Sequence, residues 1–392
     1  METRRQYRCP STDAERGALA EILANSFAFE ADKAGAWFDL AGHVNLRGYW
    51  AGDEMVGGLL GIPMGQFFGG RTVATCGIAG VGIATDRRRQ GHASGMMRAC
   101  LAELKASGYA LSTLYASNQP LYRGVGYEQA GSAHRAEIRP TDVRVVERSL
   151  SVRTLTGSDT PSVDEIHRVW AKQTAGALDR GPYVWGRVRE RQGKPTHGLG
   201  LVNEAGDLEG YLYTATERTT GDRHNLQILD VGFATPRAVR AAWTAIGDMG
   251  TMVRRVQFNT GTADPFLLAQ HHPLASVRLY ENWMVRVLDT PTALAARGYA
   301  PGLRGQVDLD IDDPDGLCGG RFRLTVEGGD GEARPGGDGN VRLDRRGLAA
   351  IYTGFLSPRQ VVMLGWGEGT TADLDQLGAF FAGPQPWLRD HF

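Results

Sequence analysis

VGIATDRRRQGHASGMM, residues 81–97, is the most informative segment of this chain for its fold. An apolar run of strand length, residues 78–84, leads into it. After Gly91 the apolar residues recur at helical spacing along one face: Met96, Met97, Cys100, Leu101 and Leu104. The pattern therefore predicts a strand, a tight turn and a helix.

The predicted turn has the form R-x-x-G-x-A. It contains Arg88, Arg89, Gln90, Gly91, His92 and Ala93. Small residues at two of these positions let a ligand approach the backbone closely. The free N–H groups of the first helical turn, together with the helix dipole, favour an anion there, and a pyrophosphate suits the site. Because the chain is rich in Gly and Arg, the same pattern is also expected by chance in an ordinary solvated turn.

Composition limits the class of protein. A chain of 392 residues is too long for one ordinary core, so two or three domains are expected. A net charge of −1 gives no general affinity for nucleic acids or for anionic membranes. The four cysteines form no C-x-x-C pair, so neither a metal site nor a disulfide is predicted. Because no apolar signal-peptide core or membrane-spanning stretch is found, we expect a cytoplasmic protein.

A repeat divides the chain. VGIATD at 81–86 recurs as VGFATP at 231–236, and each copy closes an apolar strand, at 76–84 and 226–234. A helical segment follows the second copy at 240–249. Side chains at Ala238 and Val239 would crowd a phosphate. We therefore interpret the second unit as a duplicate that has lost its ligand, although a six-residue similarity can also arise by chance.

The pattern of apolar and polar residues changes after residue 288. RFRLTV at 321–326 alternates apolar and polar residues, and VRLD at 341–344 resumes the alternation after a Gly- and Asp-rich stretch. These runs predict a hairpin with a long polar loop. Helical segments are expected at 346–352 and 371–381. The predicted domains are 1–145, 146–285 and 286–392, the last of them α+β and the whole chain mixed α/β.

A second motif follows the strand predicted at 110–116. The segment SNQPLYRGVGYE at 117–128 contains the pattern LY-x-x-x-GY. With the R-x-x-G-x-A turn upstream, the first domain resembles the Gcn5-related N-acetyltransferase superfamily. By that resemblance the turn holds the pyrophosphate of acetyl-CoA, and Tyr122 protonates the departing thiolate. The chemistry agrees, since a phenol with a pKa near 10 can serve as the acid. The alternative for Tyr122 is a buried core aromatic residue.

The whole chain resembles the enhanced intracellular survival (Eis) acetyltransferases of actinobacteria. The resemblance rests on VGIATDRRRQG, YASNQPLYRGVGY, WMVRVLDTPTALAARGYA and the final aromatic residue. It implies tandem acetyltransferase domains, the second degenerate, followed by a sterol-carrier-like domain. The acetyl-CoA site would then be lined by Val81, Gly82, Ile83, Arg88, Arg89, Gln90, Gly91, His92, Ala93, Ser94, Ser117 and Asn118. The base would be the main-chain carboxylate of Phe392, for which the alternative is a frayed tail without function.

The same resemblance implies an aromatic, acidic pocket for a small-molecule amine such as an aminoglycoside or polyamine. The candidates here are Phe27, Phe29, Glu30 and Trp37, of which Phe27 and Trp37 could equally belong to the core. The segment between Ser26 and Trp37 is shorter than is usual in the family. Asn118 stands where an acidic residue can occur, and this weakens the expectation of a polycationic acceptor. A homo-oligomer, a hexamer, is implied by the resemblance alone.

Two other functions stay open at this point. The donor could be another acyl thioester, on coenzyme A or on a carrier protein, in a natural-product pathway. The pyrophosphate turn reads the coenzyme and not the acyl group, so the sequence does not separate these donors. The chain could instead bind an apolar ligand in its sterol-carrier-like domain, but the intact Gly91, Ala93 and Tyr122 argue against an inactive transferase.

Overall fold

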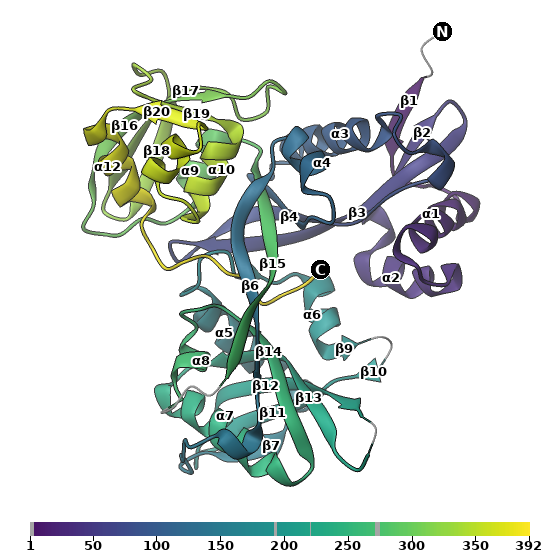
Figure 1. Ribbon diagram of the computed structural model, residues 1–392, viewed down its shortest axis with the longest axis vertical. Coiled ribbons are helices and arrows are strands. Elements are labelled where there is room, and N and C mark those ends of the chain that lie inside the picture. The colour runs from purple at the N-terminus through teal and green to yellow at the C-terminus, as the bar shows by residue number, and fades with distance from the viewer. Residues whose placement is uncertain (1–3, 192–193, 220, 271–274) are drawn as a thin grey trace.

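The computed structural model describes residues 4–191, 194–219, 221–270 and 275–392, which form three parts. Figure 1 shows the N-terminal part (purple to blue) at the upper right and the C-terminal part (green to yellow) at the upper left. The middle part (teal to green) lies below them, and two long strands, β6 and β15, run between it and the N-terminal part. The predicted mixed α/β class is confirmed.

The N-terminal part is a sheet covered by helices. Its elements are β1 (Arg5–Arg8), α1 (Asp13–Phe27), η1 (Ala31–Lys33), α2 (Ala34–Ala41), η2 (His43–Asn45), β2 (Leu46–Ala51), β3 (Glu54–Phe68), β4 (Arg71–Ile83), η3 (Thr85–Arg87), α3 (His92–Ala106), β5 (Leu111–Tyr115), α4 (Gln119–Gly124) and β6 (Glu128–Ile138). The predicted strand, turn and helix correspond to β4, residues 84–91 and α3. All five predicted apolar positions of α3 are buried, so the helical spacing predicted the buried face.

The middle part repeats this arrangement. Its elements are η4 (Pro140–Asp142), β7 (Ser151–Thr154), η5 (Gly157–Asp159), α5 (Thr160–Ala171), β8 (Leu178–Asp179), α6 (Pro182–Arg189), β9 (Glu190–Arg191), β10 (Lys194–Pro195), β11 (His197–Val202), β12 (Leu208–Arg218), β13 (His224–Phe233), α7 (Pro236–Asp248), η6 (Met249–Thr251), β14 (Val253–Thr260), α8 (Pro265–Leu268) and β15 (Ser276–Val287). Helix α7 begins four residues before the predicted start. Thr235 caps it by accepting a hydrogen bond from the Ala238 N–H, and Pro236 fits the first helical position.

The sheets of these two parts merge into one. The strand order is β1-β2-β3-β4-β5-β15-β6-β14-β13-β12-β11-β7, with β8 paired to β3. Strand β15 leaves the middle part and ends between β5 and β6, where Met284 lies opposite Leu114. Strand β6 leaves the N-terminal part and ends beside β14, where Ile138 lies opposite Val256. Since β6 and β15 each serve both halves of the sheet, the domain boundaries at 145 and 285 stay predictions.

The C-terminal part is a separate α+β unit. Its elements are α9 (Thr290–Ala296), β16 (Arg304–Asp312), β17 (Gly320–Glu327), β18 (Asp330–Pro335), β19 (Val341–Asp344), α10 (Arg345–Thr353), α11 (Pro358–Met363), β20 (Gly367–Gly369) and α12 (Thr371–Phe381). The predicted hairpin between 321–326 and 341–344 is wrong. Strand β17 turns at Gly328 and Gly329, both with positive φ, into β18, and β19 instead pairs in parallel with β16. The segment predicted to be a long polar loop contains the exposed edge strand β18.

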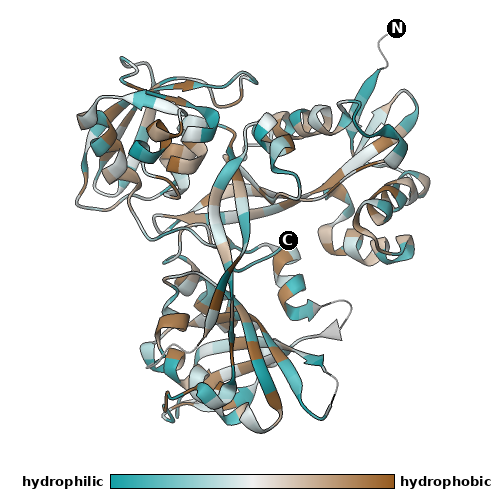
Figure 2. Ribbon diagram, viewed as in Figure 1, coloured by the Kyte–Doolittle hydropathy of each residue, from teal (hydrophilic) through white to brown (hydrophobic). Residues whose placement is uncertain are grey.

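The cores follow the strands. Figure 2 shows hydrophobic residues along the middle of the strands and hydrophilic residues at β1 and at the tips of hairpins. In the residues that the structure describes, no helix is long and apolar enough to cross a membrane.

After α12 the chain leaves the C-terminal part and crosses to the centre, where it ends beside α6 (Figure 1). Trp387, Leu388 and Phe392 are buried there, so this tail is packed.

Candidate active site

Strand β4 opens away from β5 at the predicted donor site. The two strands pair only from Thr75 to Gly77, opposite Leu111 to Thr113. Beyond this point β4 continues through Val81, Gly82 and Ile83, and it pairs with β3 alone. The register shifts between Gly58 and Leu60, and Gly80 on the facing strand has a φ of 60°. This bulge kinks β4 and leaves one strand edge free to hydrogen-bond a ligand.

The turn from β4 to α3 is an open backbone cradle. Gly91 has a φ of 78°, and a Cβ built there would meet no atom within 4 Å. Arg89 also has a positive φ, of 62°. Helix α3 has no side-chain cap, and in the described ranges the N–H groups of His92, Ala93 and Ser94 have no acceptor. Unpaired helix N–H groups beside open space are the groups that an anion can accept hydrogen bonds from, as the sequence predicts for this turn.

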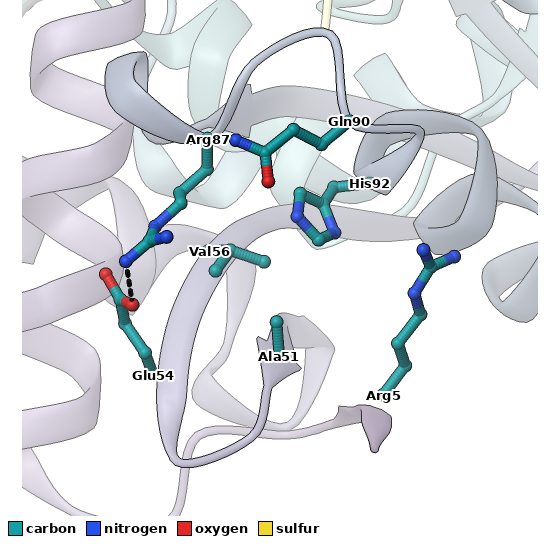
Figure 3. A pocket seen from close by; sticks show the side chains of 7 residues that line it. All are labelled: Arg5, Ala51, Glu54, Val56, Arg87, Gln90 and His92. Atoms are coloured by element: carbon teal, nitrogen blue, oxygen red, sulfur yellow. Dashed lines mark hydrogen bonds and ion pairs between the residues drawn. The ribbon is translucent and has the colours of Figure 1, made fainter. Parts of the chain in front are cut away.

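Side chains of the turn divide between two directions. Arg87, Gln90 and His92 line a cavity of about 260 Å³ with Arg5, Ala51, Glu54 and Val56 (Figure 3). Arg87 pairs with Glu54 at 2.5 Å. Burial, followed by the charges of the two arginines, lowers the pKa of His92. By contrast, Arg88 and Arg89 are exposed and lie outside this cavity, and Arg88 Nε donates to the Ile83 carbonyl at 3.3 Å.

Tyr122 lies on α4, just beyond β5. Ser117 is exposed in the connection, and the Asn118 side chain caps α4 by accepting a hydrogen bond from the Leu121 N–H at 3.4 Å. Tyr122 is 5% exposed, and burial raises its pKa to about 12. Its hydroxyl has no hydrogen-bond partner within the described part of the chain. By contrast, the Tyr127 hydroxyl is 2.7 Å from Ser112 Oγ. Tyr122 therefore keeps its proton at neutral pH and has it free to donate.

The predicted acceptor residues separate into two groups. The Trp37 ring lies over the β4 bulge, since a Cβ at Gly80 would be 2.7 Å from its Cη2. Phe29 packs edge-on against Trp37, with ring centroids 6.0 Å apart. Phe27 is 48% exposed, and the exposed Glu30 pairs with Lys33 at 2.5 Å. The structure therefore places Trp37 and Phe29 at the bulge, and leaves Phe27 and Glu30 at the surface.

The C-terminal residue lies where β4 and β5 separate. Phe392 is 7% exposed, and a Cβ at Gly77 would be 2.8 Å from its ring. The Tyr115 hydroxyl donates to the Asp390 carbonyl at 2.6 Å. His391 stacks on Tyr115 with centroids 4.8 Å apart, and burial, then Arg187 and Arg135, lowers its pKa to about 4. The tail is docked beside the free edge of β4.

Several residues of this region were not predicted. Tyr183 on α6 accepts a hydrogen bond from Trp37 Nε1 at 2.8 Å and another from Arg187 at 3.2 Å. Glu281 on β15 is 3.9 Å from His391, and burial raises its pKa. Tyr115 could have been suspected, because it closes the strand just before the LY-x-x-x-GY motif. The others come from the middle part, and no local pattern links them to the first 130 residues.

Comparison with known proteins agrees with this architecture. Residues 8–130 and 176–287 each match a family described as an acetyltransferase (GNAT) domain. Residues 290–389 match a sterol carrier protein domain. The donor turn, Tyr122 and the bulge all lie in the first match. The predicted order of domains is therefore confirmed.

Relatives cover nearly the whole chain. An uncharacterized N-acetyltransferase of Streptomyces griseus is 29% identical, with 83% of each chain covered. N-acetyltransferase Eis of Mycobacterium tuberculosis is 27% identical over 88% of this chain and 89% of that protein. The crystal structure of a GCN5-related N-acetyltransferase from Anabaena variabilis superposes with a TM-score of 0.94 at 31% identity, covering 99% of this chain and 100% of that one. The chain thus belongs to the GCN5-related N-acetyltransferases and is an acyltransferase of the Eis type, with two acetyltransferase domains and a sterol-carrier-like domain.

Proposed function

We propose that this enzyme transfers the acetyl group of acetyl-CoA to a primary amine of a small molecule. Tyr122 is the general acid, and the main-chain carboxylate of Phe392 is the general base. The observation that carries the proposal is the phenol of Tyr122, which is buried, protonated and unpaired within the described residues, in a core cluster that also contains Ile78 of β4 and Leu114 of β5. A core tyrosine would instead have its hydroxyl paired, as Tyr127 does.

The donor side fits the phosphates of coenzyme A. The N–H groups that follow Gly91 face open space, and Arg88 and Arg89 add positive charge beside them. The free edge of β4 at Val81, Gly82 and Ile83 offers backbone groups to an extended chain of amides. Ser117 and Asn118 are exposed in the connection that follows β5. Because these contacts read the coenzyme, acetyl is one acyl group among several that the site could accept.

The chemistry follows from these positions. The amine nitrogen forms a bond to the thioester carbonyl carbon, and the oxygen gains negative charge that a strand N–H can stabilise. The carbon–sulfur bond then breaks, and the thiolate takes the proton of the Tyr122 hydroxyl. The amine proton passes to the carboxylate of Phe392, directly or through a water. The products are an amide and a free thiol. The proton held by the Phe392 carboxyl group then returns through solvent to the Tyr122 phenolate, so both groups are restored and atoms and charges balance.

The surroundings of the acceptor favour a small amine with few positive charges. Arg135 and Arg187 have no ion-pair partner among the described residues. After burial, their positive charges are the causes that lower the pKa of His391, which precedes Phe392. Arg135 stacks on Tyr280 at 3.7 Å from the ring centroid, and Arg187 donates to Tyr183. Three acidic groups lie near His391 in the described residues: Glu281, the terminal carboxylate of Phe392, and Asp390, which is already paired with Arg180. Two unpaired arginines would repel an aminoglycoside or polyamine, so we propose a small or aromatic monoamine.

The test is thiol release from acetyl-CoA by untagged protein. The panel contains aminoglycosides, polyamines, lysine peptides and arylalkylamines. We expect release with the arylalkylamines and little with the polycations. Fast release with the polycations would contradict the acceptor class but keep the transferase. No release with any amine, from protein that still binds acetyl-CoA, would contradict the proposed reaction and favour another donor or acceptor.

A further inference from the structure

A buried arginine of the second domain grips the tail that carries Phe392. Arg180, between β8 and α6, donates to both oxygens of Asp230 at 2.5 and 2.8 Å. The same guanidinium contacts both oxygens of Asp390, at 2.7 Å from Nη2 and 3.1 Å from Nε. The side chains of Arg180, Asp230 and Asp390 are 1%, 1% and 6% exposed. One cation thus joins the core of the second domain to a residue two positions before Phe392.

A second buried ion pair holds the adjacent residue. Arg389 donates to Asp264 at 2.9 Å, and the two side chains are 7% and 0% exposed. Asp264 also accepts hydrogen bonds from Thr260 Oγ1 and from the Phe266 N–H, both at 3.0 Å. Because its other bonds fix Asp264 in the helix cap, this anchor is rigid. The two arginine–aspartate contacts flank the peptide bond between residues 389 and 390.

The first domain fixes the same segment from the other side. The Tyr115 hydroxyl holds the carbonyl of Asp390, and the ring of Tyr115 packs against Phe392 with centroids 5.6 Å apart. Trp387 pairs with Ser132 of β6 through an isolated parallel β-bridge of the backbone. Both domains therefore determine where the tail lies, and only His391 separates the clamped Asp390 from Phe392.

Stability alone is a poor explanation for such a cluster. Removing two carboxylates and a guanidinium from water costs much of what their attraction returns, so well-packed apolar residues would stabilise the fold as well. What the ion pairs add is direction, because a guanidinium holds each carboxylate in one plane and at one distance. A carboxylate that must meet a proton in the transition state needs such control of position.

We propose that Arg180 is a positioning residue of the active site, which acts through Asp390 to place the terminal carboxylate of Phe392. This inference rests on the proposed function, in which that carboxylate is the base. Arg180 itself contacts neither the donor nor the acceptor in this account. Its loss should misplace the base and leave the donor turn intact.

The first test needs no acceptor. A carboxypeptidase that removes C-terminal aromatic residues is added to the folded enzyme, and loss of Phe392 is followed by intact mass. We expect the wild type to be trimmed slowly and Asp390→Asn at least about tenfold faster, because a tenfold change needs only ~1.4 kcal/mol of lost docking energy. Glu209→Gln, which removes a charge from an ion pair of the second domain remote from the tail, is the matched control and should trim like the wild type. Equal trimming of Asp390→Asn and the wild type would overturn the proposal.

The second test separates placement from folding. With acetyl-CoA and the best amine of the panel, Asp390→Asn should lower kcat about 100-fold while KM for acetyl-CoA stays within about twofold, since a misplaced group loses chemistry and not donor binding. Its pH–rate profile should also lose the limb that reports the base. Arg180→Lys keeps the charge and should recover part of kcat, whereas Arg180→Met should not. An unchanged kcat and profile in a variant that releases its tail would contradict the role.

One further variant distinguishes the two proposals. A Gly-Ser extension after Phe392 replaces its carboxylate by an amide and should abolish turnover. If the extended enzyme is fully active, the terminal base is wrong, and the inference falls with it. If the extension abolishes activity while Asp390→Asn is normal in both trimming and turnover, the base stands and only the role of Arg180 fails.

Discussion

The two acetyltransferase domains use the same strand and helix but connect them differently. In the first, residues 84–91 separate β4 from α3, and the helix begins without a side-chain cap. In the second, only Ala234 and Thr235 separate β13 from α7, and Thr235 caps the helix. The carboxylate of Glu209 lies at that helix start, 2.7 Å from both Thr235 Oγ1 and Arg237 Nε. The second domain thus supplies its own anion where the first leaves room for one.

The two domains also differ at the helix that carries the proposed general acid. Helix α8 follows β14 as α4 follows β5, but it carries Phe266 and Leu267 at its buried positions and no phenol. The second domain therefore lacks counterparts of the proposed donor turn and the proposed acid, while its Arg180 contacts Asp390 and its Tyr183 contacts Trp37. Under the proposed function, the duplicate supports the other copy and does not bind a donor of its own.

The largest expected effect, and the sharpest test of the difference between the two domains, is at Tyr122. We expect Tyr122→Phe to reduce kcat by about 10²- to 10⁴-fold, because this is the usual contribution of a general acid. Acetyl-CoA affinity, measured by calorimetry, should stay close to that of the wild type. Tyr127→Phe is the matched control, because its hydroxyl is already bonded to Ser112, and it should retain turnover. Normal kcat in Tyr122→Phe would remove the functional distinction between α4 and α8.

The open turn can be tested by adding one carbon. Gly91→Ala puts a methyl group into the space beside the free N–H groups, at a φ of 78° that Ala adopts at a cost of about 1–2 kcal/mol. We expect KM for acetyl-CoA to rise about tenfold, which corresponds to ~1.4 kcal/mol. An unchanged KM would mean that the donor does not use this turn.

The capped turn should respond in stability and not in catalysis. Thr235→Ala removes the cap of α7 and should lower the free energy of unfolding by about 1 kcal/mol. Its KM for acetyl-CoA should equal that of the wild type, as measured beside Gly91→Ala. A raised KM would indicate that the second domain still takes part in donor binding.

The internal anion predicts a small dependence on pH. The hydrogen bond from Arg237 is the main cause that lowers the pKa of Glu209 from 4.5 to about 2. A depressed pKa stabilises the fold above the unfolded value, so this contribution is complete above pH 4.5 and is lost as the pH falls toward 2. Denaturant titrations across that range should show a steeper loss for the wild type than for Glu209→Gln. Parallel curves would mean that Glu209 is not held as an ion pair.

Sequence reasoning reached the parts of the fold that local patterns determine. The strand before the turn, the buried face of α3 and helix α12 follow from periodicity. The motifs that contain Gly91 and Tyr122 are local too, and their roles stay predictions. It failed at β18, because DGEARP is an edge strand whose six residues are all wholly or partly exposed, and such a strand shows no apolar alternation.

The rest of the site could not be predicted for a different reason. Arg180 and Asp390 are 210 positions apart, and Trp37 and Tyr183 are 146 apart. No helical or strand period links such residues, since they meet only after two domains have packed together. Among the predicted acceptor residues, Phe29 and Trp37 lie at the bulge, whereas an aromatic side chain such as Phe27 gives no sign in sequence that it will lie at the surface.

Strands β6 and β15, which each serve both halves of the sheet, also determine when the first domain can finish folding during synthesis. Strand β5 pairs with β4 on one side, and it obtains its second neighbour only when residues 283–287 are available, long after residue 115 has been made. At a ribosomal rate of about 5–20 residues per second, the edge of β5 stays unpaired for roughly 10–30 s. During this interval the nascent first domain exposes a strand of LSTLY that could pair with another chain. The first domain is therefore encoded first but completed late, because its sheet waits for β15, the last strand of the middle part in the sequence.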